Sequence, residues 1–205
     1  MERIILNPEN KNFIGCWKSS NTELFNKLVF FFENHKELQQ EGVTSAGLKS
    51  DQKKTTDIKI DPVEVKNKPE YSIFNEYFNE LNECFLDYKK QWPFLNELVK
   101  SVDIPSFNLQ KYNPGDHFSK IHCERDKMNL HRVFAWMTYL NTTENNEGST
   151  IFSHYELKVK PEIGKTLIWP AEWTHAHTGE ILKSGKKYMM TGWMYFPGPD
   201  LNIKK

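Results

Sequence analysis

The sequence predicts an α+β fold in which a mainly β core, a jelly roll, is supported by N-terminal helices. Two stretches of the first half carry apolar residues at helical spacing, whereas after Pro105 the chain breaks into short segments rich in β-branched and aromatic residues with turn residues between them. A chain of 205 residues can bury one sizeable core and is short for two. We therefore expect a single domain over 1–205, with 1–103 mainly helical support and 104–199 the jelly-roll core.

The first predicted helix covers residues 19–40. Ser20 followed by Glu23 has the form of a capping box at its N-terminus, and Gly42 marks its end. The apolar face repeats at a period of 3.6, with Leu24, Phe25, Leu28, Val29 and Phe32.

A polar connection over residues 43–68 follows, without aromatic residues or a helical period. We expect a long loop there, either simply exposed or lying over a functional face. A second helix is predicted from Pro69 onward, and its aromatic stripe is typical of a core-facing surface. The stripe contains Tyr71, Phe74, Tyr77, Phe78, Leu81, Phe85 and Tyr88.

Seven segments after Pro105 are predicted strands of an antiparallel sandwich or barrel. They are FNLQKY, SKIHCE, RVFAWMTYLN, STIFSHY, LKVK, KTLIW and KYMMTGWMYF. Polar NTTENNEG is predicted to form a hairpin loop, and PEIG a turn before KTLIW.

Composition excludes several classes of protein. The 27 Lys and Arg residues balance 27 Asp and Glu residues, so no broad field attracts nucleic acid or an anionic membrane. The N-terminal residues lack a signal-peptide apolar region, and no stretch approaches a membrane span, so we expect a cytoplasmic protein. The cysteines, Cys16, Cys84 and Cys123, are odd in number and widely spaced, which argues against a disulfide framework or a thiolate zinc site.

The segment KIHCE contains a candidate pair of metal ligands. On a strand, side chains alternate, so His122 and Glu124 share a face about 6.6 Å apart along the chain, while Cys123 points the other way and is best read as a small core residue. An imidazole and a carboxylate so placed can bind one ion from one side. A third ligand must then come from a distant segment.

The segment WTHAHTG offers two candidates for that third ligand, His175 and His177, and a three-ligand site has room for one of them. Two histidines and a carboxylate form the facial triad of non-haem Fe(II) oxygenases. The same set also describes a catalytic zinc site, so the ligands alone leave the metal open.

A series of motifs over residues 107–196 resembles the Fe(II)- and 2-oxoglutarate-dependent oxygenases, in particular their prolyl 4-hydroxylase-like branch, whose core is a double-stranded β-helix. In order, these motifs are YNPGDHFSKIHCE, MTYLN, EGSTIF, a glycine before KTLIWP, and HTG followed by GKKYMMTGW. Each piece is weakly specific, but their joint order and spacing are specific. The first half of the chain matches only loosely.

The resemblance implies that the metal ligands and catalytic residues are His122, Glu124 and His177. His177 is preferred to His175 because the distal histidine of the family stands about ten residues before a basic residue on the next strand, here Lys187. In the family that basic residue pairs with the distal carboxylate of 2-oxoglutarate. Lys187 shares a strand face with Met189, Thr191 and Trp193, so it should point into an apolar interior, where a cation needs a partner.

Further residues are assigned by the same resemblance. Tyr112 and Tyr139 complete the co-substrate site. Thr150, Phe152, Trp193 and Arg132 line the pocket, with Thr150 and Trp193 toward the co-substrate and Arg132 toward the substrate. The family's usual second ligand is aspartate, so the HxE motif here is a departure, with a carboxylate one methylene longer.

The implied activity is that of a dioxygenase that uses Fe(II), 2-oxoglutarate and O2, with ascorbate as a possible support, and releases succinate and CO2. The expected substrate is a prolyl residue of a protein or peptide, or a related small molecule. Two alternatives stay open: a non-catalytic metal- or ligand-binding jelly-roll protein, and zinc hydrolysis on the same three ligands. The second leaves Lys187 and the two tyrosines without a role.

Overall fold

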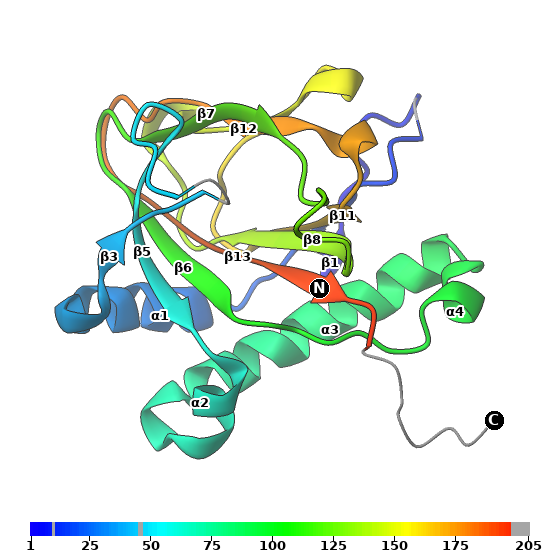
Figure 1. Cartoon of the computed structure of the whole chain (residues 1–205), viewed down its shortest axis with the longest axis horizontal. Helices are drawn as coiled ribbons and strands as arrows, with labels where there is room; N and C mark the ends of the chain where they lie inside the picture. The colour runs from blue at the N-terminus through cyan, green and yellow to red at the C-terminus, as the bar shows by residue number, and fades with distance from the viewer. Residues whose placement is uncertain (10, 45–46, 198–205) are drawn as a thin grey trace.

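The computed structural model describes residues 1–9, 11–44 and 47–197, which form two antiparallel β-sheets and a layer of helices (Figure 1). The larger sheet has eight strands in the order β1-β2-β11-β8-β13-β6-β5-β3. Their bounds, in that order, are Glu2–Arg3, Gly15–Lys18, Lys165–Pro170, Arg132–Tyr139, Lys187–Tyr195, Phe107–Tyr112, Thr56–Ile60 and Gln40–Glu41.

The smaller sheet has five strands in the order β10-β9-β12-β7-β4 and faces the larger one. Its strands are Leu157–Val159, Thr150–Phe152, His177–Gly179, His117–His122 and Lys53–Lys54. Two facing antiparallel sheets of this kind form the jelly-roll core that the strand pattern predicts. The predicted end of that core at residue 199 lies outside the described residues.

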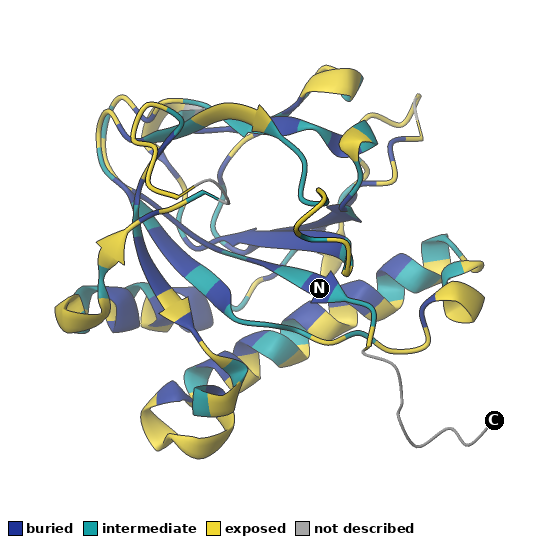
Figure 2. Ribbon diagram, in the orientation of Figure 1, coloured by how far each residue is buried: buried dark blue, intermediate teal, exposed yellow. Residues whose placement is uncertain are grey.

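Helices α1 (Thr22–Asn34) and α3 (Ile73–Gln91) lie beneath the larger sheet, on the side away from the smaller one (Figure 1). Their apolar faces pack on the outer face of that sheet, and Figure 2 shows the buried residues along this contact. The predicted aromatic stripe of α3 is part of this core, with Phe74, Tyr77 and Tyr88 fully buried. Short helices α2 (Pro62–Asn67) and α4 (Leu95–Leu98) flank α3.

Alternate residues of β8 pack against two different layers of the fold. Phe134 and Trp136 face the helices, whereas Ala135, Met137 and Tyr139 face the smaller sheet. This alternation is the period of two expected for a strand buried on both faces. The inner faces of the two sheets enclose a cavity of about 690 Å³.

The first half of the chain is more than helical support. It supplies β1, β2, β3 and β5 to the larger sheet and β4 to the smaller one. The predicted loop over 43–68 therefore contains two strands and α2, and residues 45–46 within it lie outside the described residues. Strand pairing overrides the polar composition of this segment, because β4 pairs with β7 and β5 with β6.

The start of α1 also differs from the predicted capping box. Asn21 is the N-cap, and its side-chain oxygen accepts a hydrogen bond from the Leu24 backbone N–H. Both patterns satisfy an unpaired amide of the first turn, so the helix begins within two residues of the predicted position. In the described ranges, no helix is long and apolar enough to cross a lipid bilayer.

Candidate functional site

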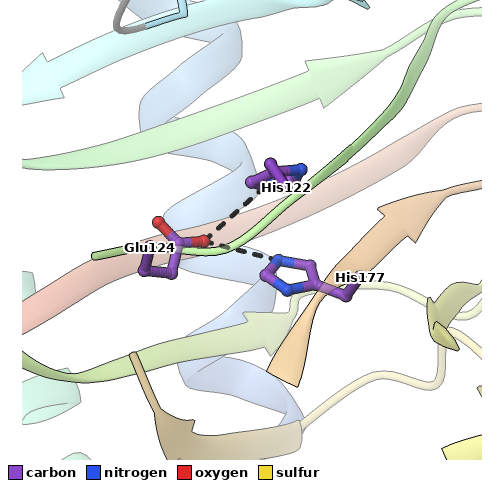
Figure 3. A group of neighbouring side chains, drawn as sticks. All are labelled: His122, Glu124 and His177. Carbon is purple, nitrogen blue, oxygen red and sulfur yellow. Dashed lines mark ion pairs between the residues drawn. The ribbon is translucent and has the colours of Figure 1, made fainter. Parts of the chain in front are cut away.

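His122, Glu124 and His177 meet in the cavity between the two sheets (Figure 3). One ligand atom from each side chain lies within 4.8 Å of the others. His122 ends β7 and His177 begins β12, and the two residues are cross-strand partners. Backbone pairing therefore places the two imidazoles side by side, with ring centroids 4.4 Å apart.

Glu124 reaches the two histidines from just beyond the end of β7. Its Oε1 lies 3.4 Å from His177 Nε2 and 3.7 Å from His122 Nε2, the pairs joined by dashed lines in Figure 3. Both separations are shorter than twice a metal–nitrogen distance of about 2.1 Å, so one ion between these atoms can bind all three side chains with small movements. The strand predicted through Glu124 ends at His122 in the structure, so Glu124 lies just beyond it. The side chains of His122 and Glu124 nevertheless lie close together, as predicted.

Backbone carbonyls orient both imidazoles. The Nδ1 atom of His122 lies 2.9 Å from the Lys120 carbonyl oxygen, and that of His177 lies 2.9 Å from the His175 carbonyl oxygen. Hydrogen bonds of this kind put the proton on Nδ1 and leave the Nε2 lone pair free to bind a metal.

Electrostatics favour the protonation states that a metal needs. Burial, with the neighbouring His177, lowers the pKa of His122 to about 4, so this imidazole is neutral at pH 7. Burial alone raises the pKa of Glu124, but its close contacts with the His177 and His122 rings and the hydrogen bond from the Trp193 N–H outweigh it and lower that pKa to about 2. A neutral imidazole beside a carboxylate is ready to bind a divalent cation.

His175 lies outside this group. It sits in a short 3₁₀ helix, Trp173–His175, and its Nε2 lies 2.9 Å from the Asn12 carbonyl oxygen. His175 and His177 do not share a strand face, because the extended conformation of β12 begins only at His177. The geometry therefore brings His177, and not His175, to His122 and Glu124.

Lys187 points into the same cavity, together with the three residues that share its face on β13. It is 2% exposed, and its Nζ donates to the Gly148 carbonyl at 2.9 Å and lies 3.9 Å from the Tyr112 ring centroid. Burial lowers the pKa of Lys187 to about 7, partly offset by Glu180. In the described part of the chain, no carboxylate lies within ion-pair distance of this ammonium.

The predicted co-substrate residues divide into two groups. Tyr112 and Thr150 line the cavity beside Lys187. Tyr139 lies behind Thr150, with its hydroxyl donating to Thr150 Oγ1 at 2.7 Å, and Phe152 is fully buried against His177. These two residues support the cavity wall and do not reach the cavity.

Arg132 and Trp193 also line the cavity. The guanidinium carbon of Arg132 lies 3.7 Å from the Trp193 ring centroid, a stacked arrangement. Cys123 differs from its predicted place in the core. It is partly exposed and lines the cavity, with its thiol donating to the Arg125 carbonyl at 3.2 Å, because the strand ends before it and alternation no longer applies.

The cavity wall also contains a buried polar network that the sequence patterns did not predict. Lys53 and Asp57 form an ion pair of 2.7 Å with both side chains buried. Gln110 Nε2 donates to Asp57 at 3.0 Å, and the Tyr112 hydroxyl donates to Gln110 at 3.2 Å. One signal was present in FNLQKY, where polar Asn108 and Gln110 alternate with buried apolar residues and share a face with Tyr112.

Comparisons with known proteins agree with this arrangement. Residues 107–195 match the family model of the 2OG-Fe(II) oxygenase superfamily. No match was found among curated proteins. The matched residues include all three of His122, Glu124 and His177, and also Lys187.

Several solved structures have a similar fold. A prolyl-4-hydroxylase of Pseudomonas putida has a TM-score of 0.70 at 15% identity, covering 92% of this chain and 95% of that one. A Trichoplax adhaerens prolyl hydroxylase in complex with a hypoxia inducible factor oxygen degradation domain peptide fragment has a TM-score of 0.69 at 14% identity, covering 93% and 86%. The viral collagen prolyl hydroxylase of Paramecium Bursaria Chlorella virus-1, in its 2OG complex, has a TM-score of 0.64 at 14% identity, covering 91% and 97%.

The superfamily uses Fe(II), 2-oxoglutarate and O2, and the His-Glu-His group is a candidate site for the iron. The fold is that of the prolyl hydroxylases over nearly the whole chain. Residues 107–195 therefore match the 2OG-Fe(II) oxygenase superfamily and the chain has a prolyl hydroxylase-like fold, and together these findings support a 2-oxoglutarate- and Fe(II)-dependent dioxygenase.

Proposed function

We propose that this dioxygenase hydroxylates a prolyl residue of a protein or peptide substrate and releases succinate and CO2, and that the chain forms a single domain. The observation that carries the proposal is one cavity lined both by the His-Glu-His group and by an unpaired buried ammonium. The first can hold Fe(II), and the second can bind the far end of a dicarboxylate. Bound together, Fe(II), 2-oxoglutarate and O2 supply the oxidising chemistry that inserts oxygen into a C–H bond.

In this proposal His122, Glu124 and His177 hold the iron through Nε2, Oε1 and Nε2. Three protein ligands on one side of an ion leave the other positions open for small molecules. The backbone carbonyls behind both imidazoles keep the rings in the metal-binding orientation before any ion arrives.

Lys187 is the proposed anchor for the distal carboxylate of 2-oxoglutarate. An ammonium that is 2% exposed and that, among the described residues, donates only to a carbonyl is costly in the free protein, and an incoming carboxylate removes that cost. Thr150 adds a hydroxyl at the cavity wall, and Tyr139 fixes its direction from behind. Tyr112 covers the ammonium with its ring and keeps water away from it.

A peptide substrate fits the cavity better than a small metabolite alone. A volume of about 690 Å³ is larger than a small dicarboxylate needs. Two lining residues, Val43 and Met128, are 57% and 77% exposed, so apolar surface lies at the edge of the cavity where a bound chain would cover it. The prolyl residue as target rests on the shared fold with prolyl hydroxylases.

Two measurements test this function. Anaerobic addition of Fe(II) and 2-oxoglutarate should give a visible charge-transfer band, which should be absent in His177→Ala. Proline-containing peptides should then gain one oxygen atom by mass with an equal amount of succinate formed, whereas peptides with alanine in place of proline should not. Tight binding of both Fe(II) and 2-oxoglutarate without the band would favour the non-catalytic alternative, and turnover of the alanine peptides would exclude proline as the target.

A further inference from the structure

The two carboxylate oxygens of Glu124 have different surroundings. Oε1 faces the Nε2 atoms of His122 and His177. Oε2 faces away from them and accepts a hydrogen bond from Trp193 Nε1 at 2.6 Å, with Arg132 Nη1 at 3.5 Å. One oxygen is thus directed to the metal side, and the other is bound to donors on the protein side.

Both donor residues belong to strands of the larger sheet. Trp193 belongs to β13 and Arg132 to β8, and the two strands are paired. Arg132 stacks on the Trp193 ring and also donates from Nη1 to the Glu124 backbone carbonyl at 2.9 Å. The same arginine therefore holds both the main chain of Glu124 and the ring that binds its carboxylate.

A glutamate in this place needs such support. Glu124 lies beyond the end of β7, and its side chain is one methylene longer than that of aspartate, so it has one more torsion angle to fix. A carboxylate with two free oxygens can also bind an ion through one or both of them. Binding Oε2 elsewhere removes that choice and leaves Oε1 as the single ligand atom.

We propose that Trp193, with Arg132 stacked on it, is a positioning residue that holds the outer oxygen of Glu124, so that this longer carboxylate binds the metal through one oxygen. The proposal rests on the iron site of the proposed function. It gives the HxE motif of this chain a physical reason, because the additional methylene extends the outer oxygen to the indole N–H. Aspartate at this position would hold its carboxylate about 1.5 Å further back, too far for that hydrogen bond.

The test measures Co(II) binding to the metal-free protein, without 2-oxoglutarate, by calorimetry and by the visible spectrum of the bound ion. Trp193→Phe removes the N–H and keeps a ring for Arg132. Trp169→Phe is the matched control, since Trp169 is a buried indole of the same cavity that packs edge-on against His177 and whose Nε1 has no hydrogen-bond partner among the described residues. We expect Trp193→Phe to weaken Co(II) binding about 10- to 100-fold and to change the spectrum, and Trp169→Phe to change affinity by about twofold at most.

A double-mutant cycle shows whether the indole acts through the carboxylate. In the Glu124→Asp background, Trp193→Phe should have little further effect, because the shorter side chain no longer reaches the indole. An equal loss in both backgrounds, or a loss no greater than that of Trp169→Phe, would overturn the proposal.

Folding of the variants is checked by thermal unfolding of the metal-free proteins. Should Trp193→Phe fail to fold, benzothienylalanine at position 193 keeps the bicyclic shape and lacks only the N–H donor, and the same loss of affinity is expected. Failure of the wild type to bind Co(II) would refute the metal site itself. Normal binding by every variant would refute only the role of Trp193.

Discussion

Replacing Lys187 by methionine should make the free protein more stable while weakening its binding of 2-oxoglutarate. Burial lowers the pKa of Lys187 from 10.5 to about 7, which corresponds to a penalty on the order of 5 kcal/mol for the charged form. Methionine removes that penalty and also the hydrogen bond to Gly148 and the contact with the Tyr112 ring, worth about 1 to 3 kcal/mol together. The net gain in the free energy of unfolding should be about 2 to 4 kcal/mol at pH 6.

The sign of the pH dependence follows from the lowered pKa. Between pH 7 and 10.5 the unfolded chain binds a proton on Lys187 that the folded chain has lost, so the wild type gains stability as pH rises through this window. Below pH 7 both states are protonated, and the full penalty is present. The advantage of Lys187→Met should therefore be greatest at pH 6 and much smaller at pH 10.

Urea unfolding at pH 6 and pH 10 measures this difference, with Lys186→Met as the control because the preceding lysine is exposed. Titration calorimetry should show 2-oxoglutarate binding weakened about 10- to 100-fold in Lys187→Met, the loss of one charge-assisted contact. A variant that is less stable than wild type at pH 6, yet binds 2-oxoglutarate normally, would refute both the buried charge and its role as anchor.

Three further outcomes follow from the site. His177→Ala should abolish Fe(II) binding in calorimetry, whereas His175→Ala should keep it, and the reverse result would show the wrong histidine to be the ligand. Thr150→Val leaves Tyr139 without its main acceptor and should weaken 2-oxoglutarate binding about 2- to 10-fold, measured by the same titration; unchanged binding would remove Thr150 from the co-substrate site. Asp57→Ala leaves Lys53 buried without its carboxylate partner and should lower the free energy of unfolding, measured in urea, by about 3 to 5 kcal/mol. A loss below about 1 kcal/mol would contradict this role of the ion pair.

Most of the strands after Pro105 could be predicted because their apolar periodicity is strong and each run ends at a turn. FNLQKY coincides with β6, and the segments beginning at Arg132, Lys165 and Lys187 begin β8, β11 and β13. The strands β2, β4 and β12 could not be predicted in this way. They are two to four residues long, and pairing with a neighbour, rather than their own composition, makes them strands.

The convergence of His122, Glu124 and His177 in one cavity with Lys187 could be predicted for a different reason, since motif order and spacing identify residues whose partners are far away in sequence. Motif spacing does not predict the hydrogen bonds that the site residues make with the residues behind them. Tyr139 was placed beside the co-substrate, but its hydroxyl binds Thr150 instead. The hydrogen bond from Trp193 to Glu124 joins two segments 69 residues apart, and it depends on the exact end of a strand, which sequence patterns place least reliably.

Because His122 and His177 pair across β7 and β12, an ion bound to both imidazoles would connect the ends of these two strands. β12 has only three residues, so its own ladder contributes little to holding the smaller sheet together. An ion bound by both strands adds its binding free energy to that pairing. Without such an ion the centre of the smaller sheet would be held less firmly, and amide exchange in β7 and β12 would speed up before the helix-backed sheet responds.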